Sequence, residues 1–220
     1  MAAMRMTTPH TKSIALLASL LIMSLSSCLP QPTAGVRALH FKKVAAGGEI
    51  DPKTLLTLQE IPEDKYLSIP EAMQKAPIGS LMVVCWYDNE SPWGPCSHIT
   101  RKYSDTTLID VVSFREVIRE YPLDHMNPRY AVIVLDTGVT PEKLPLMFNK
   151  AKEYWGKVYD VSGFPGTYYC STLQNGLERA MGLPDAMPFN KEWNVYLPAD
   201  SLFLPQVKVR YVGVNEGSRL

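Results

Sequence analysis

An excess of charge of either sign is absent from this sequence. Its 220 residues include 22 basic and 22 acidic side chains, so the formal net charge is zero. Proteins that bind nucleic acids neutralise phosphates with a surplus of lysine and arginine, and we therefore exclude that class of partner. Internal repeats are also missing, and the length fits one well-buried domain rather than two.

A hydrophobic run long enough to span a membrane is missing too. The stretch SIALLASLLIMSL near the N-terminus is shorter than the ~18 residues that a spanning helix needs. It follows Arg5, His10 and Lys12, which is the arrangement of a secretory signal. The stretch ends in LSSC at residues 25–28, which resembles the bacterial lipobox, whose cysteine becomes the lipidated first residue of the mature protein.

The lipobox pattern predicts a signal peptide over residues 1–27, a lipidated Cys28 with a tether over residues 28–45, and one domain over residues 46–220. A short membrane anchor or an uncleaved signal is the alternative. Acyl chains on Cys28 would hold the protein firmly on a membrane. Leu29 follows where an aspartate would favour inner-membrane retention, so the resemblance implies the bacterial outer membrane, facing the periplasm.

Cysteine is scarce. Apart from Cys28, the chain contains Cys85, Cys96 and Cys170, and an odd number in an exported protein leaves at least one free thiol or an intermolecular bridge. Cys85 and Cys96 lie eleven positions apart and an oxidising periplasm would permit their pairing, but spacing alone does not fix the distance between their Cα atoms. If they pair, Cys170 is the remaining thiol.

Local patterns predict an α+β domain, in which a largely antiparallel sheet packs on helices. Ser113 and Glu116 have the spacing of a capping box, which predicts a helix that ends at Tyr121. Apolar alternation, continuous apolar runs and turn residues predict the remaining elements. Helices are predicted over residues 52–60, 113–121, 140–156 and from residue 170 onward, and strands over residues 80–87, 97–103, 107–112, 129–136 and 207–214.

The predicted helix that begins at Cys170 carries one apolar stripe, formed by Cys170, Leu173, Leu177 and Met181. Cys170 therefore lies in the first turn and faces inward. Two interpretations remain open. The residue is either a small buried filler or a nucleophile whose thiolate is stabilised by the positive end of the helix dipole.

A nucleophilic thiol needs a base and a group that orients the base. Histidine is rare in the predicted domain and tether, where His40, His98 and His125 are the candidates. His98 opens a predicted strand, and a tight turn at Asp105 would bring Asp110 of the next strand beside it. A carboxylate there would fix the imidazole tautomer and stabilise the charged ring, although a core histidine and a solvated aspartate explain either residue taken alone.

The order of five motifs resembles a known family. PIGSLMVV, CSHIT, TLIDV, YYCSTL and LPADSLFLPQVKVRYVG follow one another as in the circularly permuted papain-like proteins of the NlpC superfamily, in particular the bacterial YaeF/YiiX lipoproteins. The resemblance covers residues 77–214. It implies that Cys170 is the nucleophile, His98 the base and Asp110 the orienting acid, and that neither a cofactor nor a metal is required.

The function that follows from this resemblance is a lipid-anchored cysteine hydrolase or acyltransferase of the thiol-protease type. Its substrates would be amide or ester bonds of the cell envelope, in peptidoglycan peptides or in lipids. Helix-start amides would bind the oxyanion. Tyr168 and Tyr169 would line the substrate cleft, or else serve as ordinary packing aromatics.

Three departures from the family pattern support an alternative. Ser80 replaces an acidic residue after Gly79, Thr172 replaces another after the cysteine, and the strand after His98 carries charges at Arg101 and Lys102, where relatives are apolar. A charged strand is expected to dehydrate the site poorly. The alternative is therefore an inactive lipid-anchored binding module with a papain-like cleft. A metal site formed by His98, Cys96 and Asp110 is a further hypothesis, without a supporting motif.

Overall fold

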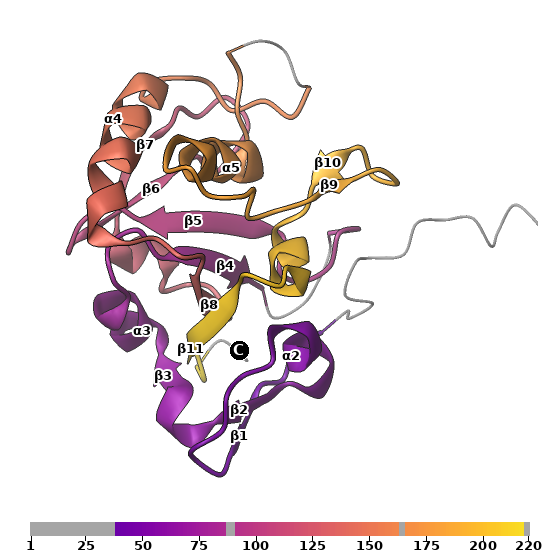
Figure 1. Cartoon of the computed structure of the whole chain (residues 1–220). Coiled ribbons are helices and arrows are strands. Elements are labelled where there is room, and N and C mark those ends of the chain that lie inside the picture. Colours follow the sequence, from indigo (N-terminus) through magenta and orange to yellow (C-terminus); the bar gives the residue numbers. More distant parts are fainter. Residues whose placement is uncertain (1–37, 87–90, 163–165, 218–220) are drawn as a thin grey trace, which may run out of the picture. The chain divides into compact units, whose positions relative to one another are not determined.

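A seven-stranded sheet organises the domain in the computed structural model, which describes residues 38–86, 91–162 and 166–217 (Figure 1). The strand order is β3-β11-β8-β4-β5-β6-β7. β11 runs parallel to β3, and every other neighbouring pair in this sheet is antiparallel. The strands are β3 (Tyr66–Ser68), β4 (Leu81–Cys85), β5 (His98–Lys102), β6 (Thr107–Asp110), β7 (Arg119–Pro122), β8 (Ala131–Asp136) and β11 (Lys208–Val214).

Helices and two small ribbons complete the domain. The α-helices are α2 (Pro52–Leu58), α3 (Ile69–Lys75), α4 (Leu144–Tyr154) and α5 (Cys170–Ala180). Short 3-10 helices are η1 (Glu63–Lys65), η2 (Leu123–Met126), η3 (Pro141–Lys143) and η4 (Pro198–Phe203). The ribbons pair β1 (Lys42–Val44) with β2 (Glu60–Pro62), and β9 (Phe189–Asn190) with β10 (Val195–Tyr196).

Both faces of the central strands are covered, with α4 and α5 on the opposite side of the sheet from α3 (Figure 1). Successive side chains of a strand point to opposite faces. In β4, Leu81 and Val83 therefore belong to one core cluster, and Met82 and Val84 to another that includes residues of α3. This double burial explains the continuous apolar run that predicts β4, and the same holds for β8.

The α+β architecture predicted from the sequence, with a largely antiparallel sheet packed on helices, is confirmed. The predicted strands over residues 80–87, 129–136 and 207–214 appear as β4, β8 and β11. The helix predicted from Thr140 begins with the expected N-cap and a proline at its first position, but its first turn is the 3-10 helix η3 before α4 continues.

The helix predicted over residues 113–121 is wrong. One turn forms, in which the Glu116 amide donates to the Ser113 carbonyl, and the chain then becomes the strand β7. Backbone groups of this segment pair with residues 156–159, for example from the Ile118 amide to the Lys157 carbonyl. This pairing, together with the burial of Ile118 and Tyr121, overrides the local helix signal.

The boundary between the tether and the domain is also corrected. Leu39 and Phe41 are buried in the core, and β1 pairs with β2, so residues 38–45 belong to the domain rather than to the predicted tether over 28–45. The sequence contains one indication of this boundary, because the apolar residues Leu39 and Phe41 follow a stretch that begins with Pro and small residues. The predicted signal peptide and the lipidation site Cys28 lie outside the described residues.

Candidate active site

Cys170 occupies the first position of α5, where the sequence predicts it. Cys170, Leu173, Leu177 and Met181 are all buried, so the predicted inward stripe is confirmed. Cys170 is the free cysteine within the described residues. The first amides of an α-helix have no partner inside the helix and carry a partial positive charge, so the sulfur begins a helix whose dipole favours a negative charge at that point.

Thr172 fastens the start of this helix. Its hydroxyl Oγ1 accepts from the Tyr169 amide at 3.0 Å and donates to the Tyr169 carbonyl, also at 3.0 Å. A side chain three residues beyond the N-cap that reaches back to the N-cap amide performs half of a capping box. Thr172 therefore supplies, without a charge, a bond that an acidic side chain would make at this position.

His98 and Asp110 meet across the hairpin of β5 and β6, which turns at Asp105 as predicted. His98 Nε2 lies 2.8 Å from Asp110 Oδ2, and the Val111 amide donates to Asp110 Oδ1 at 2.7 Å. Both carboxylate oxygens are thus held, and Asp110 is completely buried. The imidazole is oriented by a carboxylate that is itself fixed.

The pKa of His98 reflects two opposing effects. Burial lowers it, because a charged ring loses its hydration, but Asp110 and Cys170 outweigh this effect and raise the pKa of His98 from 6.5 to about 10. The ring therefore carries a proton at neutral pH. Because Asp110 occupies Nε2, Nδ1 is the ring nitrogen that remains to exchange a proton with the Cys170 sulfur.

The structure thus brings together the three residues that sequence reasoning selected. Their surroundings are closed, since Cys170 and His98 are each only 6% exposed. Trp86 meets the His98 ring edge-on, with ring centroids 6.4 Å apart. Two surface cavities of about 560 and 500 Å³ lie elsewhere, and neither is lined by these three residues.

Sequence reasoning missed Tyr159. Burial raises the pKa of Tyr159 to about 12, and smaller contributions come from Cys170, Tyr169 and Asp110, which places its hydroxyl near the reactive groups. Its backbone forms an isolated bridge with Tyr168, two residues before the cysteine. Nothing in the local sequence distinguishes Tyr159 from the other tyrosines of this region, because the pairing of its backbone with Tyr168 is visible only in the folded structure.

Tyr168 and Tyr169, the predicted cleft residues, are half-buried and already have partners. The Tyr168 ring packs against Tyr154, with centroids 4.6 Å apart. The Tyr169 hydroxyl accepts a hydrogen bond from the Tyr196 amide at 2.9 Å. These contacts hold the segment before α5 against its neighbours.

The charged residues of β5 are buried rather than hydrated, so the expectation that they keep water near the site is wrong. Arg101 is fully buried and pairs with Glu178 of α5, Nη2 to Oε1, at 2.5 Å. Lys102 points to the other face, where its ammonium donates to the Met73 and Gln74 carbonyls, each at 2.9 Å.

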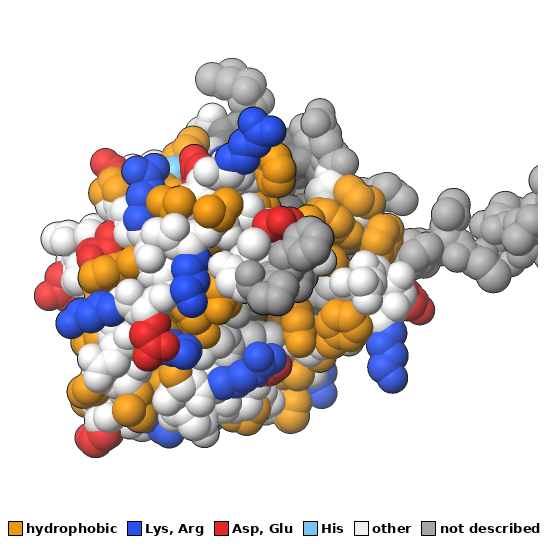
Figure 2. Space-filling model, turned by 90° about the horizontal axis from the view of Figure 1, so that it is seen from above, with side chains coloured by type: hydrophobic (Ala, Val, Ile, Leu, Met, Phe, Trp, Pro, Cys, Tyr) orange, Lys and Arg blue, Asp and Glu red, His pale blue; other side chains and the backbone are white. Residues whose placement is uncertain are grey.

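Cys96 forms a disulfide with Cys85, so it cannot be a thiolate ligand and the metal site with His98 and Asp110 is contradicted. Within the described ranges, no three His, Cys, Asp or Glu side chains form a group that could hold a metal ion. The helices of those ranges are also too short or too polar to cross a membrane. The face seen from above in Figure 2 mixes basic, acidic and hydrophobic side chains without a field of one sign.

The fold is similar to that of a solved bacterial protein. The crystal structure of the metalloprotein YiiX from Escherichia coli O157:H7 matches with a TM-score of 0.50 and 15% sequence identity, over 61% of this chain and 96% of the YiiX chain. No protein-family model matches the sequence, and no curated protein matches it. The name of YiiX calls it a metalloprotein, whereas the described residues of this chain contain no group of three His, Cys, Asp or Glu side chains that could hold a metal ion. The likeness therefore concerns the fold alone, and this chain has a YiiX-like α+β fold.

Proposed function

We propose that the protein is a cysteine hydrolase or acyltransferase with Cys170 as nucleophile, His98 as base and Asp110 as orienting acid. The observation that carries the proposal is the His98 ring, whose Nε2 lies 2.8 Å from the Asp110 carboxylate and whose pKa is raised by both Asp110 and Cys170. A nucleophile, a base and an orienting group in contact are the requirements of covalent acyl transfer. The permuted papain-like relation named above belongs to this proposal.

The proposed reaction proceeds in two halves. The Cys170 sulfur forms a bond to a carbonyl carbon while its proton resides on His98, and the carbonyl oxygen becomes an oxyanion that amides at the start of α5 can bind. The bond from carbon to the leaving amine or alcohol then breaks, and His98 returns the proton to that group. Water, or another acceptor, adds to the acyl-enzyme, and the thiol is released with a carboxylic acid or a transferred acyl product.

The proposed substrates are amide or ester bonds of the cell envelope, in peptidoglycan peptides or in lipids. Lipidation at Cys28 would keep the domain at the outer membrane, next to both kinds of molecule. The anchor therefore restricts the compartment and does not choose between the two substrates.

Iodoacetamide labelling of the full chain in detergent tests the activation of the thiol. Labelling of Cys170 is followed by mass spectrometry from about pH 5 to about pH 10, and His98→Gln serves as the matched control because it preserves the burial of the sulfur. We expect the native chain to react at least about tenfold faster than His98→Gln at neutral pH. Equal rates would refute the proposed pair. A muropeptide digest and phospholipid micelles, each analysed by mass spectrometry, then distinguish the substrates.

The near-complete burial of Cys170 and His98 favours a second candidate, an anchored binding module that performs no chemistry. The two functions differ in their dependence on the sulfur. If Cys170→Ala preserves the cellular phenotype of the protein while substitutions that block the cleft abolish it, the binding module is correct and the enzyme is not.

A further inference from the structure

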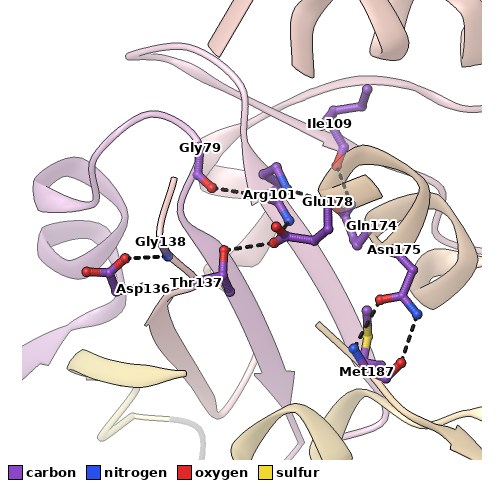
Figure 3. Close-up of polar contacts among 10 residues, drawn as sticks. All are labelled: Gly79, Arg101, Ile109, Asp136, Thr137, Gly138, Gln174, Asn175, Glu178 and Met187. Carbon is purple, nitrogen blue, oxygen red and sulfur yellow. Dashed lines mark hydrogen bonds and ion pairs between the residues drawn. The ribbon is translucent and has the colours of Figure 1, made fainter. Parts of the chain in front are cut away.

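A second polar cluster lies along α5 behind the cysteine, and the proposed chemistry does not use it (Figure 3). Arg101 is its centre. Besides the ion pair with Glu178, its Nε donates to Gln174 Oε1 at 3.0 Å and its Nη1 to the Gly79 carbonyl at 2.8 Å. The Thr137 hydroxyl donates to the same Glu178 oxygen at 2.8 Å. The guanidinium is therefore held from several directions.

Stability alone does not account for this cluster. Arg101, Gln174 and Glu178 are all completely buried. Removing two charges from water costs several kcal/mol for each ion, and well-packed apolar residues of the same volume are often as stabilising as a buried ion pair. Glu178 Oε2 is moreover buried with no hydrogen-bond partner among the described residues, which adds a further cost.

The cluster connects the three elements that carry the candidate catalytic residues. Gln174 lies one helical turn after Cys170, and its Nε2 donates at 3.2 Å to the carbonyl of Ile109, the residue before Asp110. Its other amide atom accepts from Arg101, which lies three positions after His98 in β5. A single side chain of the cysteine helix thus holds the histidine strand and the aspartate strand.

Directional bonds fix what apolar packing leaves free. Leu173 and Leu177 bury the same face of α5, but contacts between apolar side chains are non-directional and permit small rotations and slides of a helix. Bonds to a guanidinium fork require defined distances and angles. A displacement of about 1 Å at a reacting group reduces rates by about 100-fold.

From these observations we propose that Arg101, Gln174 and Glu178 are positioning residues, which set the rotation and height of α5 so that the Cys170 sulfur meets the His98 ring. The inference rests on the proposed function and deepens it. The three residues touch no reacting atom and act through the helix.

The test replaces the ion pair by apolar residues in the full chain, as the double variant Arg101→Met/Glu178→Leu. Both charges leave together, so no unpaired charge remains, and we expect a folded protein whose thermal stability falls only by the effect of the Gln174 and Gly79 oxygens that lose their donor. Iodoacetamide labelling of Cys170 at neutral pH should fall about tenfold, and the pKa of His98, measured by NMR titration of the ring, should decrease. Lys102→Met is the matched control, since it removes the neighbouring buried charge from the same strand on the opposite face.

Each outcome has a defined meaning. A folded double variant with native labelling kinetics and a native His98 titration overturns the inference, whereas altered kinetics in the double variant and native kinetics in Lys102→Met support it. If the double variant does not fold, Gln174→Met provides the same readouts, and native values in it overturn the inference. Failure of the proposed function is recognised separately, because the native chain would then label no faster than His98→Gln, while the NMR titration still reports the position of the ring.

Discussion

Replacing Asp110 by asparagine isolates the effect of the buried carboxylate on His98. The rise of the pKa of His98 from 6.5 to about 10 corresponds to about 5 kcal/mol in favour of the charged ring, at about 1.4 kcal/mol for each pKa unit. Burial opposes this rise, so Asp110 and Cys170 together contribute more than the net value. Asparagine keeps the volume and removes the charge. We therefore expect the pKa of His98 to fall toward 6.5 or below.

The same substitution should weaken the reactive pair. A hydrogen bond to a charged group contributes about 1.5–3 kcal/mol, which corresponds to a decrease of roughly 10- to 100-fold in the labelling rate of Cys170 at neutral pH. The assay is iodoacetamide labelling across pH, with His98→Gln as the lower reference. A folded Asp110→Asn variant with the native rate and the native pH profile would refute the assignment of Asp110.

Stability should change with pH in a defined direction. The folded pKa of His98 lies above its unfolded value of 6.5, so the contribution of this ring to stability is fully present below about pH 6.5 and is lost as the pH rises toward about 10. The free energy of unfolding of the native chain, measured by urea titration, should decline over this window. Asp110→Asn should flatten the decline, and an equal slope in both proteins would contradict the reasoning.

Three further predictions concern the surroundings of the site. Replacing Cys85 and Cys96 together by alanine opens a loop with a sequence separation of 11 and should lower the free energy of unfolding in urea by about 3 kcal/mol; a loss below about 1 kcal/mol would contradict the loop-entropy argument. Gly176→Ala places a methyl group against the Tyr154 hydroxyl and ring, so thermal denaturation should show a loss of about 1–3 kcal/mol, and a neutral result would mean that the ring yields. Burial raises the pKa of Tyr159 to about 12, so Tyr159→Phe should remove a late-ionising tyrosine from the ultraviolet titration, and loss of one that ionises at about 10 would contradict this.

The regular elements were predictable where one local pattern determines them. β4 and β8 are apolar on both faces because both faces are buried, and the helix at Cys170 combines a regular stripe with a stop at Gly182. The segment after Ser113 was not predictable from its own residues. Its conformation depends on backbone pairing with residues 156–159, about forty positions along the chain, and a local capping signal contains no information about that pairing.

The three candidate catalytic residues were predictable from the sequence, but the buried residues that hold their strands and helix in place were not. Cysteine and histidine are rare here, so the sequence offers few candidates, and the resemblance to a known family selects Cys170 and His98 among them. A tight hairpin brings Asp110 to the ring. The role of Arg101 was misinterpreted because charged residues in a strand normally indicate a solvated face. Its partner Glu178 lies 77 positions away, so the sequence shows the charge without its compensation.

Arg101 and Lys102 of β5 are both buried cations, whereas the sequence predicted that charges in this strand would keep the site hydrated. Neighbouring side chains of a strand point to opposite faces, so Arg101 bonds to α5 on one side while Lys102 bonds to the last carbonyls of α3 on the other. The strand is therefore fixed to both helical layers just beyond the residue that carries the imidazole. An apolar residue in place of Arg101 would preserve burial and leave α5 free to shift against β5, and any such shift would move the Cys170 sulfur relative to His98. The charges at Arg101 and Lys102 therefore favour an ordered site. These are the same residues that, as departures from the family pattern, motivate the alternative of an inactive cleft.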